Sequence, residues 1–405
     1  MKICQHAGRA FWPQSEVSAR RFVLTRLAFA ALFSLLLFSC PTSTWSADLV
    51  EEKVFFRVMI DGRTVRLQGL TVKRADAADK LPIALITHGK ASNLGSMLDL
   101  QPESQIGPAR DLARRGWLAV IVLRRGFGQS DGPMPRPMSC ESTSFNERFS
   151  ADADDLQATL ESIAQRPDAD ATRAIAIGVS AGGAAVSALA ARNPKNLLGV
   201  INVSGGLRFQ TCPKDDALVA AFREFGARSR VPGLWLYAKN DALFGPALVD
   251  RMHDAFLDGG GDVKLVMYDA FGSDGHSLFS NGRLQWLMEM DAFLRVRKLP
   301  TWQSKDVDAL MRKLKSQNRD FVEKYLAGPS ERALARSSTS EYMHMSWGFG
   351  TIELARARAL EGCQRRKAGE QCAIVMENDR WIDDGVANRP AAPEAAPLIA
   401  GQGSP

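Results

Sequence analysis

One short stretch constrains the fold of this chain more than any other. The apolar run 174–177 leads into Gly178-Val179-Ser180-Ala181-Gly182, and a segment rich in helix-forming residues follows. This pattern predicts a buried strand that turns sharply into a helix, with Ser180 at the turn. Glycine fits on each side of the serine, because a Cβ there would clash where strand and helix approach closely. Ser180 is therefore a candidate nucleophile.

Strand-like and helix-like segments alternate through residues 47–298. The strand-like segments are apolar throughout, which is typical of a mostly parallel sheet covered by helices on both faces. Asp61-Gly62 lies between two further strand-like runs and predicts a hairpin ahead of them. The predicted strands are 81–89, 117–123, 174–177, 198–203, 234–237 and 263–268, and the helices are 108–115, 151–165, 184–191, 246–257 and 281–297. We therefore expect an α/β fold.

A serine nucleophile needs a general base, because its hydroxyl is barely ionised near neutral pH. The sequence has five histidines, and His276 lies on a glycine-rich loop after the last predicted strand of the sheet. Open α/β sheets place their sites at such carboxyl ends of strands, so we predict His276 as the base. The other four lie in the N-terminal leader, at the end of an early strand, within a helix and in a separate C-terminal segment: His6, His88, His253 and His344.

The acid that orients the base is expected between Ser180 and His276 in the sequence. Asp241 is best placed, because it directly follows the predicted strand 234–237. Its role would be to hold the imidazole tautomer and to stabilise the imidazolium. The alternatives are Asp269 and Asp274 near His276 and, less well placed, Asp215 and Asp216.

Stabilisation of a developing oxyanion requires two backbone N–H donors. The first is predicted to be the amide of Ala181, at the start of the helix after the nucleophile. For the second we nominate the amide of Lys90, in the loop after His88-Gly89. On this interpretation the His88 ring has a structural role, and the Lys90 side chain takes no part.

Taken in order, these motifs resemble the α/β-hydrolase fold. Residues 50–298 are similar to the dienelactone hydrolase-like and prolyl-oligopeptidase-like serine hydrolases, which share an Arg-Gly-x-Gly-x-Ser element after the fourth strand. The chain departs from the first group at Ser180, where cysteine is common, and lacks the His-Gly-Gly-Gly of hormone-sensitive-lipase-type esterases. The motifs that carry the resemblance are His88-Gly89, Arg125-Gly126-Phe127-Gly128-Gln129-Ser130-Asp131-Gly132, Gly178-Val179-Ser180-Ala181-Gly182-Gly183, Asp241 and His276.

The resemblance implies a serine hydrolase that forms an acyl-enzyme at Ser180. Among such enzymes we favour an esterase that acts on a small or medium acyl substrate. A peptidase or amidase is an alternative, since the same triad cleaves both bonds. A catalytically inactive binding protein on the same fold is a third hypothesis. We expect no metal and no cofactor, because the sequence has neither a His-x-x-x-His pattern with clustered ligands nor a glycine-rich phosphate loop.

Residues 1–46 have the pattern of a secretory signal peptide. Basic residues precede the apolar run 27–38, which is short for a bilayer span, and small residues follow it. We favour cleavage near Ser46 and a periplasmic or secreted protein without an integral membrane span. Lipidation at Cys40, a twin-arginine signal at Arg20-Arg21 and an uncleaved anchor are the alternatives.

The leader also accounts for most of the positive charge. The formal net charge of the whole chain is +6, and five basic residues and one acidic residue lie before Ala47. The remaining chain is close to neutral, so the sequence gives no argument for nucleic-acid binding.

Cysteine usage is consistent with an exported protein. Once Cys4 and Cys40 leave with the leader, an even number of cysteines remains, which favours disulfides in an oxidising compartment. Cys363 and Cys372 flank a polar loop and form the obvious local pair, which leaves Cys140 to pair with Cys212. Four free thiols are the alternative.

The C-terminal segment after residue 298 differs from the α/β part. We predict a helical linker over 299–339, a small α+β module with its own disulfide over 340–384, and a disordered tail rich in Pro and Ala over 385–405. The module resembles small domains appended to bacterial exported proteins, a likeness that assigns no function. Binding of an unknown partner and a stabilising cap are both open for it.

Overall fold

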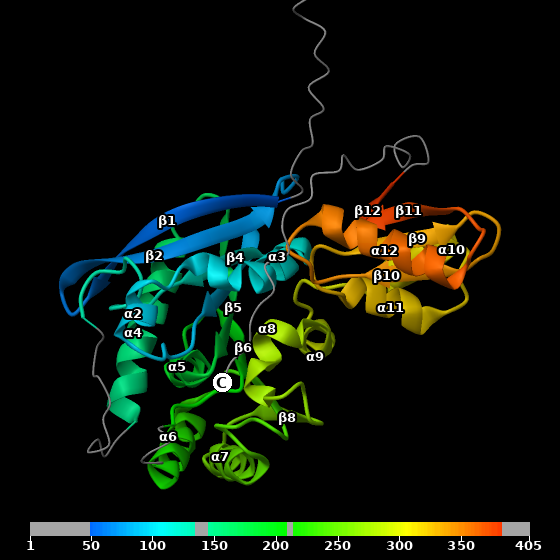
Figure 1. Ribbon diagram of the computed structural model, residues 1–405. Helices are drawn as coiled ribbons and strands as arrows, with labels where there is room; N and C mark the ends of the chain where they lie inside the picture. The colour runs from blue at the N-terminus through cyan, green and yellow to red at the C-terminus, as the bar shows by residue number, and fades with distance from the viewer. Residues whose placement is uncertain (1–48, 134–144, 209–213, 383–405) are drawn as a thin grey trace, which may run out of the picture. The chain divides into compact units, whose positions relative to one another are not determined.

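The computed structural model describes residues 49–133, 145–208 and 214–382 (Figure 1). Its main sheet has eight strands in the order β1-β2-β4-β3-β5-β6-β7-β8. All neighbours from β4 to β8 are parallel, and β1 and β2 join antiparallel at one edge. The strands are β1 (Leu49–Ile60), β2 (Arg63–Arg74), β3 (Leu81–Thr87), β4 (Leu118–Val122), β5 (Ala169–Val179), β6 (Leu197–Val203), β7 (Gly233–Ala238) and β8 (Val263–Tyr268). The predicted mostly parallel α/β sheet is confirmed.

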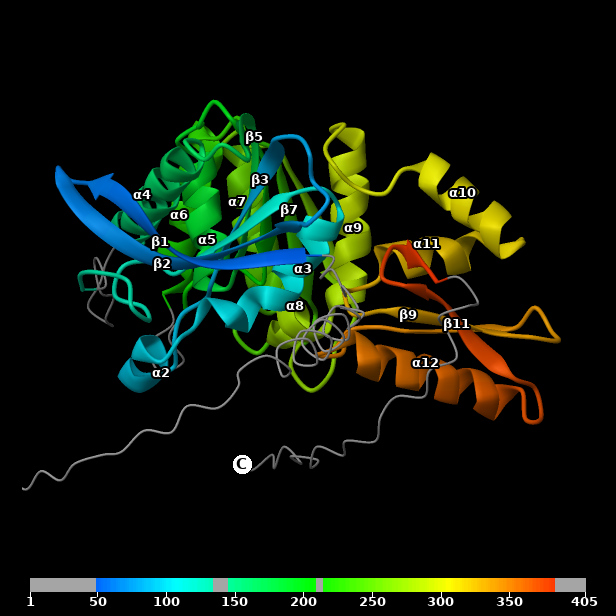
Figure 2. The same ribbon diagram turned by 90° about the horizontal axis from the view of Figure 1, so that it is seen from above.

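Helices cover both faces of this sheet because the central strands alternate between two apolar faces. Ile83 and Leu85 of β3 pack with helices α4 to α7, whereas Ala84 and Ile86 pack with α3, α8 and α9. Figure 2 shows these two groups of helices on opposite sides of the strands. The helices are α3 (Ile106–Arg114), α4 (Asn146–Ile163), α5 (Ala181–Ala190), α6 (Asp215–Arg228), α7 (Pro246–Asp258), α8 (Leu278–Asn281) and α9 (Arg283–Val296).

The hairpin predicted at Asp61-Gly62 is confirmed, since β1 and β2 pair antiparallel on each side of it. Five elements of the α/β part were not predicted: the short helices α2 (Leu94–Leu98) and α8, the 3₁₀ turns η1 (Pro102–Gln105) and η2 (Gly275–Ser277), and helix α6. Helix α6 lies between β6 and β7 and contributes Leu218 and Phe222 to the core. It therefore completes the helical layer on that face.

The C-terminal part forms a second, antiparallel sheet in the order β10-β9-β11-β12. Helices α10 and α11 pack against one face, through side chains such as Leu310 and Tyr325. Helix α12 covers the other face through Ala355 and Ala359. Figure 2 shows the strands between α11 and α12. The elements are α10 (Ser304–Leu314), α11 (Arg319–Ala327), β9 (Ala333–Ser337), β10 (Met343–Ser346), α12 (Ile352–Arg366), β11 (Cys372–Glu377) and β12 (Arg380–Trp381).

This arrangement does not agree with the start of the module that we predicted at residue 340. Strand β9 lies within the segment 299–339 that we predicted as a helical linker, and it pairs with both β10 and β11. Helices α10 and α11 share an apolar core with Leu334 and Met376 of this sheet. The segment that reads as a linker therefore supplies an inner strand and one helical layer of the module.

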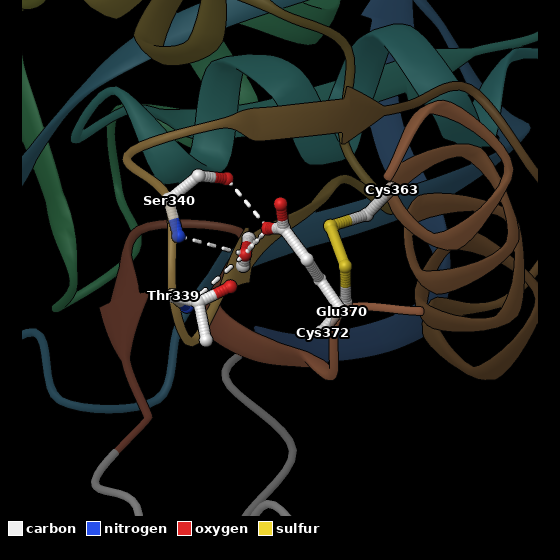
Figure 3. The surroundings of a disulfide bond; sticks show 6 residues. Thr339, Ser340, Cys363, Glu370 and Cys372 are labelled. Atoms are coloured by element: carbon white, nitrogen blue, oxygen red, sulfur yellow. Dashed lines mark hydrogen bonds between the residues drawn. A yellow bond between two sulfur atoms is a disulfide. The ribbon is translucent and has the colours of Figure 1, made fainter. Parts of the chain in front are cut away.

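The predicted local disulfide is confirmed. Cys363 near the end of α12 is bonded to Cys372 at the start of β11. Figure 3 shows the Glu370 side chain beside this bond, where its carboxylate accepts a hydrogen bond of 2.6 Å from the Ser340 hydroxyl. The disulfide thus ties helix α12 to the sheet that it covers, close to a turn held by polar contacts.

Several predicted features lie outside the described residues: the signal peptide, the lipidation site Cys40, the pair Cys140 and Cys212, and the tail 385–405. Across the described ranges, no helix combines the length and the apolar character needed to cross a membrane.

Candidate active site

Ser180 occupies a strained turn between β5 and α5. Its φ is 54° and its ψ is −124°, a conformation that residues with a Cβ rarely adopt. The flanking glycines allow the turn because there is no room for side chains. A Cβ on Gly178 would lie 2.0 Å from the carbonyl oxygen of Gly182, and one on Gly182 would lie 2.4 Å from that of His88. The strand, turn and helix predicted around Ser180 are therefore present, with the half-buried serine at the bend.

Backbone hydrogen bonds tie this turn to the neighbouring strand β6. The Ser180 amide donates to the Val203 carbonyl (3.0 Å), and the Gly206 amide donates to the Ser180 carbonyl (3.0 Å). The loop around Gly206 is held in turn by the buried Tyr237 hydroxyl, which donates to the Gly205 carbonyl (2.6 Å) and accepts from Asn202 (3.3 Å). Asn202 and Tyr237 are not among the residues predicted from the sequence, although polar residues in apolar strands were a signal that could have identified them.

Asp241 and His276 meet at the ends of β7 and β8. The His276 Nδ1 atom lies 3.0 Å from Oδ2 and 3.2 Å from Oδ1 of Asp241. The buried carboxylate also accepts hydrogen bonds from the backbone amides of Leu243 (2.9 Å) and Phe244 (3.0 Å). Because an ionised carboxylate only accepts hydrogen bonds, Nδ1 carries the proton in the neutral ring. The Nε2 atom is therefore left as the acceptor, which is the tautomer that a general base requires.

Phe244 links this pair to the serine turn. Its ring centroid lies 5.7 Å from that of His276, and a Cβ on Gly206 would lie 2.4 Å from its Cε1 atom. Gly206 in turn donates to the Ser180 carbonyl. Within the described residues, the Ser180 hydroxyl makes no hydrogen bond. Ser180 and the His276 ring are therefore not hydrogen-bonded to each other in this conformation. Catalytic hydrogen bonds are often long without substrate and tighten when it binds.

The loop after β3 passes beside the nucleophile. A Cβ on Gly89 would lie 3.0 Å from the Ser180 Cβ and 3.6 Å from its Oγ. Lys90, the nominated second donor of an oxyanion hole, directly follows and is exposed. Ala181, the first nominated donor, begins helix α5 and is buried. Ala181 thus follows Ser180 directly along the chain, and Lys90 follows the glycine that approaches the Ser180 side chain.

His88 has the structural role suggested by its place at the end of a strand. Its Nε2 accepts a hydrogen bond from the Arg124 amide (3.1 Å), so Nδ1 carries the proton and donates to the Gly89 carbonyl (2.8 Å). Burial, with a smaller contribution from the Arg124 charge, holds the pKa of His88 well below its usual value. The ring is therefore neutral and fixes the loop beside Ser180.

A buried ionic network supports the same loop. The Arg124 side chain donates to the Thr87 hydroxyl (2.7 Å) and to the His88 carbonyl (2.8 Å), and it pairs with Asp152 of α4 (3.3 Å). The adjacent Arg125 donates to Asp155 through its backbone amide (2.7 Å) and through Nε (2.6 Å). Helix α4 thus anchors the ends of β3 and β4 through two buried carboxylates.

Asp155 makes the stability of this region dependent on pH. Burial raises the pKa of Asp155 from 3.8 to about 6, although Arg125 opposes the shift. Below about pH 4 the carboxyl is protonated in both the folded and the unfolded chain. Between about pH 4 and pH 6 the unfolded chain ionises while the folded chain keeps its proton, so the unfolded state is favoured and the stability falls. Over this range we expect the free energy of unfolding of wild type to fall relative to that of Asp155→Asn, by on the order of 3 kcal/mol.

Urea denaturation between pH 4 and pH 7 checks this prediction, with wild type compared with Asp155→Asn. Asp154→Asn is the matched control, because the side chain of Asp154 is 38% exposed and pairs with Arg192 at the surface. A constant difference between wild type and Asp155→Asn across the range would contradict the expected dependence on pH.

The other residues considered as acid or base have different surroundings. Asp269 pairs with Lys239 and its side chain is 92% exposed, whereas Asp274 accepts hydrogen bonds from backbone amides. The remaining acidic alternatives form ion pairs with Arg208 and Arg251: Asp215 and Asp216. Of the described histidines, His276 is the one that bonds a buried carboxylate through its ring.

A cavity of about 610 Å³ lies elsewhere in the α/β part, between helices α4, α5 and α6. It is lined by charged residues such as Arg192, Glu224 and Arg228, and by none of the three predicted catalytic residues. In the described ranges, no group of three or more His, Cys, Asp or Glu side chains is arranged to hold a metal ion.

The sheet order and the turn at Ser180 show that this part of the chain has the α/β-hydrolase fold. Residues 82–228 match the family model described as "Serine aminopeptidase, S33". The matched segment lies within the α/β part, in line with the resemblance that the motifs carry. A search of curated proteins found no match.

The solved structures to which this chain is similar are distant in sequence. A putative dienelactone hydrolase from Klebsiella pneumoniae is 19% identical, with 59% of this chain and 97% of that chain covered and a TM-score of 0.41. An esterase from Pyrococcus furiosus is 15% identical, with 60% of this chain and 90% of that chain covered and a TM-score of 0.44. A dipeptidyl peptidase 4 from Porphyromonas gingivalis is 17% identical, with 57% of this chain and 34% of that chain covered and a TM-score of 0.42.

Proposed function

We propose that this protein is an exported serine hydrolase that cleaves carboxylic esters through Ser180, His276 and Asp241. One observation carries the proposal: the buried Asp241 carboxylate binds His276 Nδ1 at 3.0 Å, at the same edge of the sheet as the strained Ser180. A structural histidine needs no such partner beside a strained serine. The combination of orienting acid, base and nucleophile is what acyl transfer requires.

The proposed mechanism follows from these positions. The Ser180 Oγ attacks the ester carbonyl while His276 Nε2 takes its proton, and Asp241 stabilises the imidazolium that forms. The amides of Ala181 and Lys90 donate to the oxyanion of the tetrahedral intermediate. When the intermediate collapses, the imidazolium gives its proton to the departing alcohol and an acyl-enzyme remains. Water, activated by His276, then releases the acid and regenerates Ser180.

A peptidase or amidase is the second candidate, because the matching family model is described as a serine aminopeptidase. The same triad hydrolyses both kinds of bond. Substrates that share an acyl group separate the two candidates. We expect p-nitrophenyl acetate to give a kcat/KM at least roughly tenfold above that of p-nitroacetanilide and of aminoacyl p-nitroanilides, because the ester leaving group needs less stabilisation.

The experiment uses the chain from Ala47 onward and a Ser180→Ala control for background hydrolysis. A higher kcat/KM for the aminoacyl p-nitroanilides would overturn the esterase assignment in favour of an aminopeptidase. Absence of hydrolysis of every substrate would favour a binding protein on the same fold.

Export is proposed from the leader pattern of residues 1–46. Intact mass and N-terminal sequencing of the mature protein from fractionated cells test it. A chain beginning near Ala47 would support simple cleavage, and a lipid-modified Cys40 at the N-terminus would support membrane anchoring. An unprocessed chain in the cytosol would contradict export.

A further inference from the structure

The loops that carry Asp241 and His276 hold each other through two reciprocal side-chain contacts. Asn240 belongs to the loop after β7, and its Oδ1 accepts from the Phe271 amide (2.8 Å) in the loop after β8. Its Nδ2 donates to the carbonyls of Phe271 and Gly272 (3.2 Å each). Asp274 belongs to the loop after β8, and its Oδ1 accepts from the amide of Ala242 (3.0 Å) in the loop after β7.

The same oxygen of Asp274 also accepts from the backbone amide of His276 (2.9 Å). One carboxylate oxygen therefore bridges the residue after Asp241 and the backbone of the base itself. The two loops also approach closely at Gly275, where a Cβ would lie 2.7 Å from the Ala238 Cβ and 2.9 Å from the Asp241 amide nitrogen. This approach brings the His276 ring within reach of a carboxylate that lies on a different strand.

We propose that Asp274 is a positioning residue that sets the distance between His276 and Asp241 by bridging their two loops. The inference rests on the proposed triad and deepens it. Asp274 does not touch the reacting atoms: its Oδ1 contacts backbone amides, and its side chain lies beside the base rather than at the nucleophile. A displacement of about 1 Å in such a site is enough to cost roughly 100-fold in rate.

Two substitutions separate the hydrogen bonds of Asp274 from its charge. Asp274→Asn keeps an Oδ1 acceptor for both amides and removes the charge, whereas Asp274→Ala removes the acceptor as well. Asp269→Ala is the matched control, because Asp269 lies on the same loop with its side chain 92% exposed. Asn240→Ala tests the reciprocal contact, and it replaces Asp274→Ala if that variant does not fold.

With p-nitrophenyl acetate, we expect Asp274→Ala to lower kcat by roughly 10- to 100-fold and to change KM by less than about threefold. Asp274→Asn and Asp269→Ala should stay within about threefold of wild type in kcat. Rescue by Asn would distinguish positioning from a general loss of stability. An unchanged kcat in Asp274→Ala, or an equal loss in Asp274→Asn, would overturn the proposal.

A second readout does not depend on activity. The proton on His276 Nδ1 should give a downfield ¹H NMR resonance that is lost in His276→Ala. We expect this resonance to persist in Asp274→Asn and to shift or disappear in Asp274→Ala. Wild type that shows the resonance without any hydrolysis would refute the proposed function and still test the positioning. A wild-type protein that shows neither the resonance nor hydrolysis would refute the His276–Asp241 contact and, with it, the proposal.

Discussion

Ser180→Ala should lower kcat on a p-nitrophenyl ester by about 10⁴- to 10⁶-fold, because no acyl-enzyme can form without the hydroxyl. Thermal unfolding should change little, since the Ser180 hydroxyl has no hydrogen-bond partner within the described ranges. Ser187→Ala is the matched control: Ser187 lies on α5, is buried, and donates only to the Gly183 carbonyl (3.0 Å). A folded Ser180→Ala variant that retains more than about 1% of the turnover would exclude Ser180 as the nucleophile.

The same experiment extends to the partners of the serine. His276→Ala should lose about as much as Ser180→Ala, because the two residues act as a unit in proton transfer. Asp241→Asn should lose about 10³- to 10⁴-fold, because the amide no longer fixes the required tautomer of His276. The Ser180→Ala/His276→Ala double variant should be no slower than either single variant. A multiplicative loss would mean that the two side chains act independently.

Asp111→Ala should lower the free energy of unfolding by about 3–5 kcal/mol, because it leaves the largely buried side chain of Arg283 without its counter-charge. The Asp111 side chain on α3 is fully buried and accepts from Nε (2.9 Å) and Nη2 (2.8 Å) of Arg283 at the start of α9. It also accepts from the Ser330 amide, between α11 and β9. One carboxylate therefore joins two helices of the α/β part to the C-terminal module.

Chemical denaturation of Asp111→Ala measures this contribution. Asp308→Ala is the matched control, because Asp308 forms an exposed ion pair with Arg319 and its loss should cost less than about 1 kcal/mol. Replacement of the buried pair by Asp111→Leu/Arg283→Met should recover much of the loss, since no unpaired charge then remains. A loss below about 1 kcal/mol in Asp111→Ala would contradict a supporting role for this network.

Local patterns in the sequence were sufficient to predict the central sheet and the turn at Ser180. The buried parallel strands are continuous apolar runs, and Gly178 and Gly182 mark a close approach that leaves no room for a Cβ. Ser180, Asp241 and His276 each follow a predicted strand, so we expected all three at the carboxyl ends of strands. The structure brings the last two into contact, and the pairing of Cys363 with Cys372 followed from their spacing around a short loop.

Other features depend on tertiary contacts that no local pattern encodes. Strand β9 has the sequence Ala-Leu-Ala-Arg-Ser, which favours a helix in isolation, and it is extended because β10 and β11 pair with it on both sides. Asp274 was an alternative acid by its closeness to His276 in the sequence. Its bond to the Ala242 amide could not be foreseen, because it joins loops that follow different strands.

The central claim is that Ser180 is a nucleophile activated by His276, and covalent labelling tests it most directly. The protein from Ala47 onward is treated with a fluorophosphonate, and the adduct is mapped by mass spectrometry in wild type, Ser180→Ala, His276→Ala and Ser187→Ala. We predict a single adduct on Ser180, which is absent in Ser180→Ala, at least about 10²-fold slower in His276→Ala and unchanged in Ser187→Ala. A folded wild-type protein that forms no adduct, or one labelled equally fast without His276, would contradict this account.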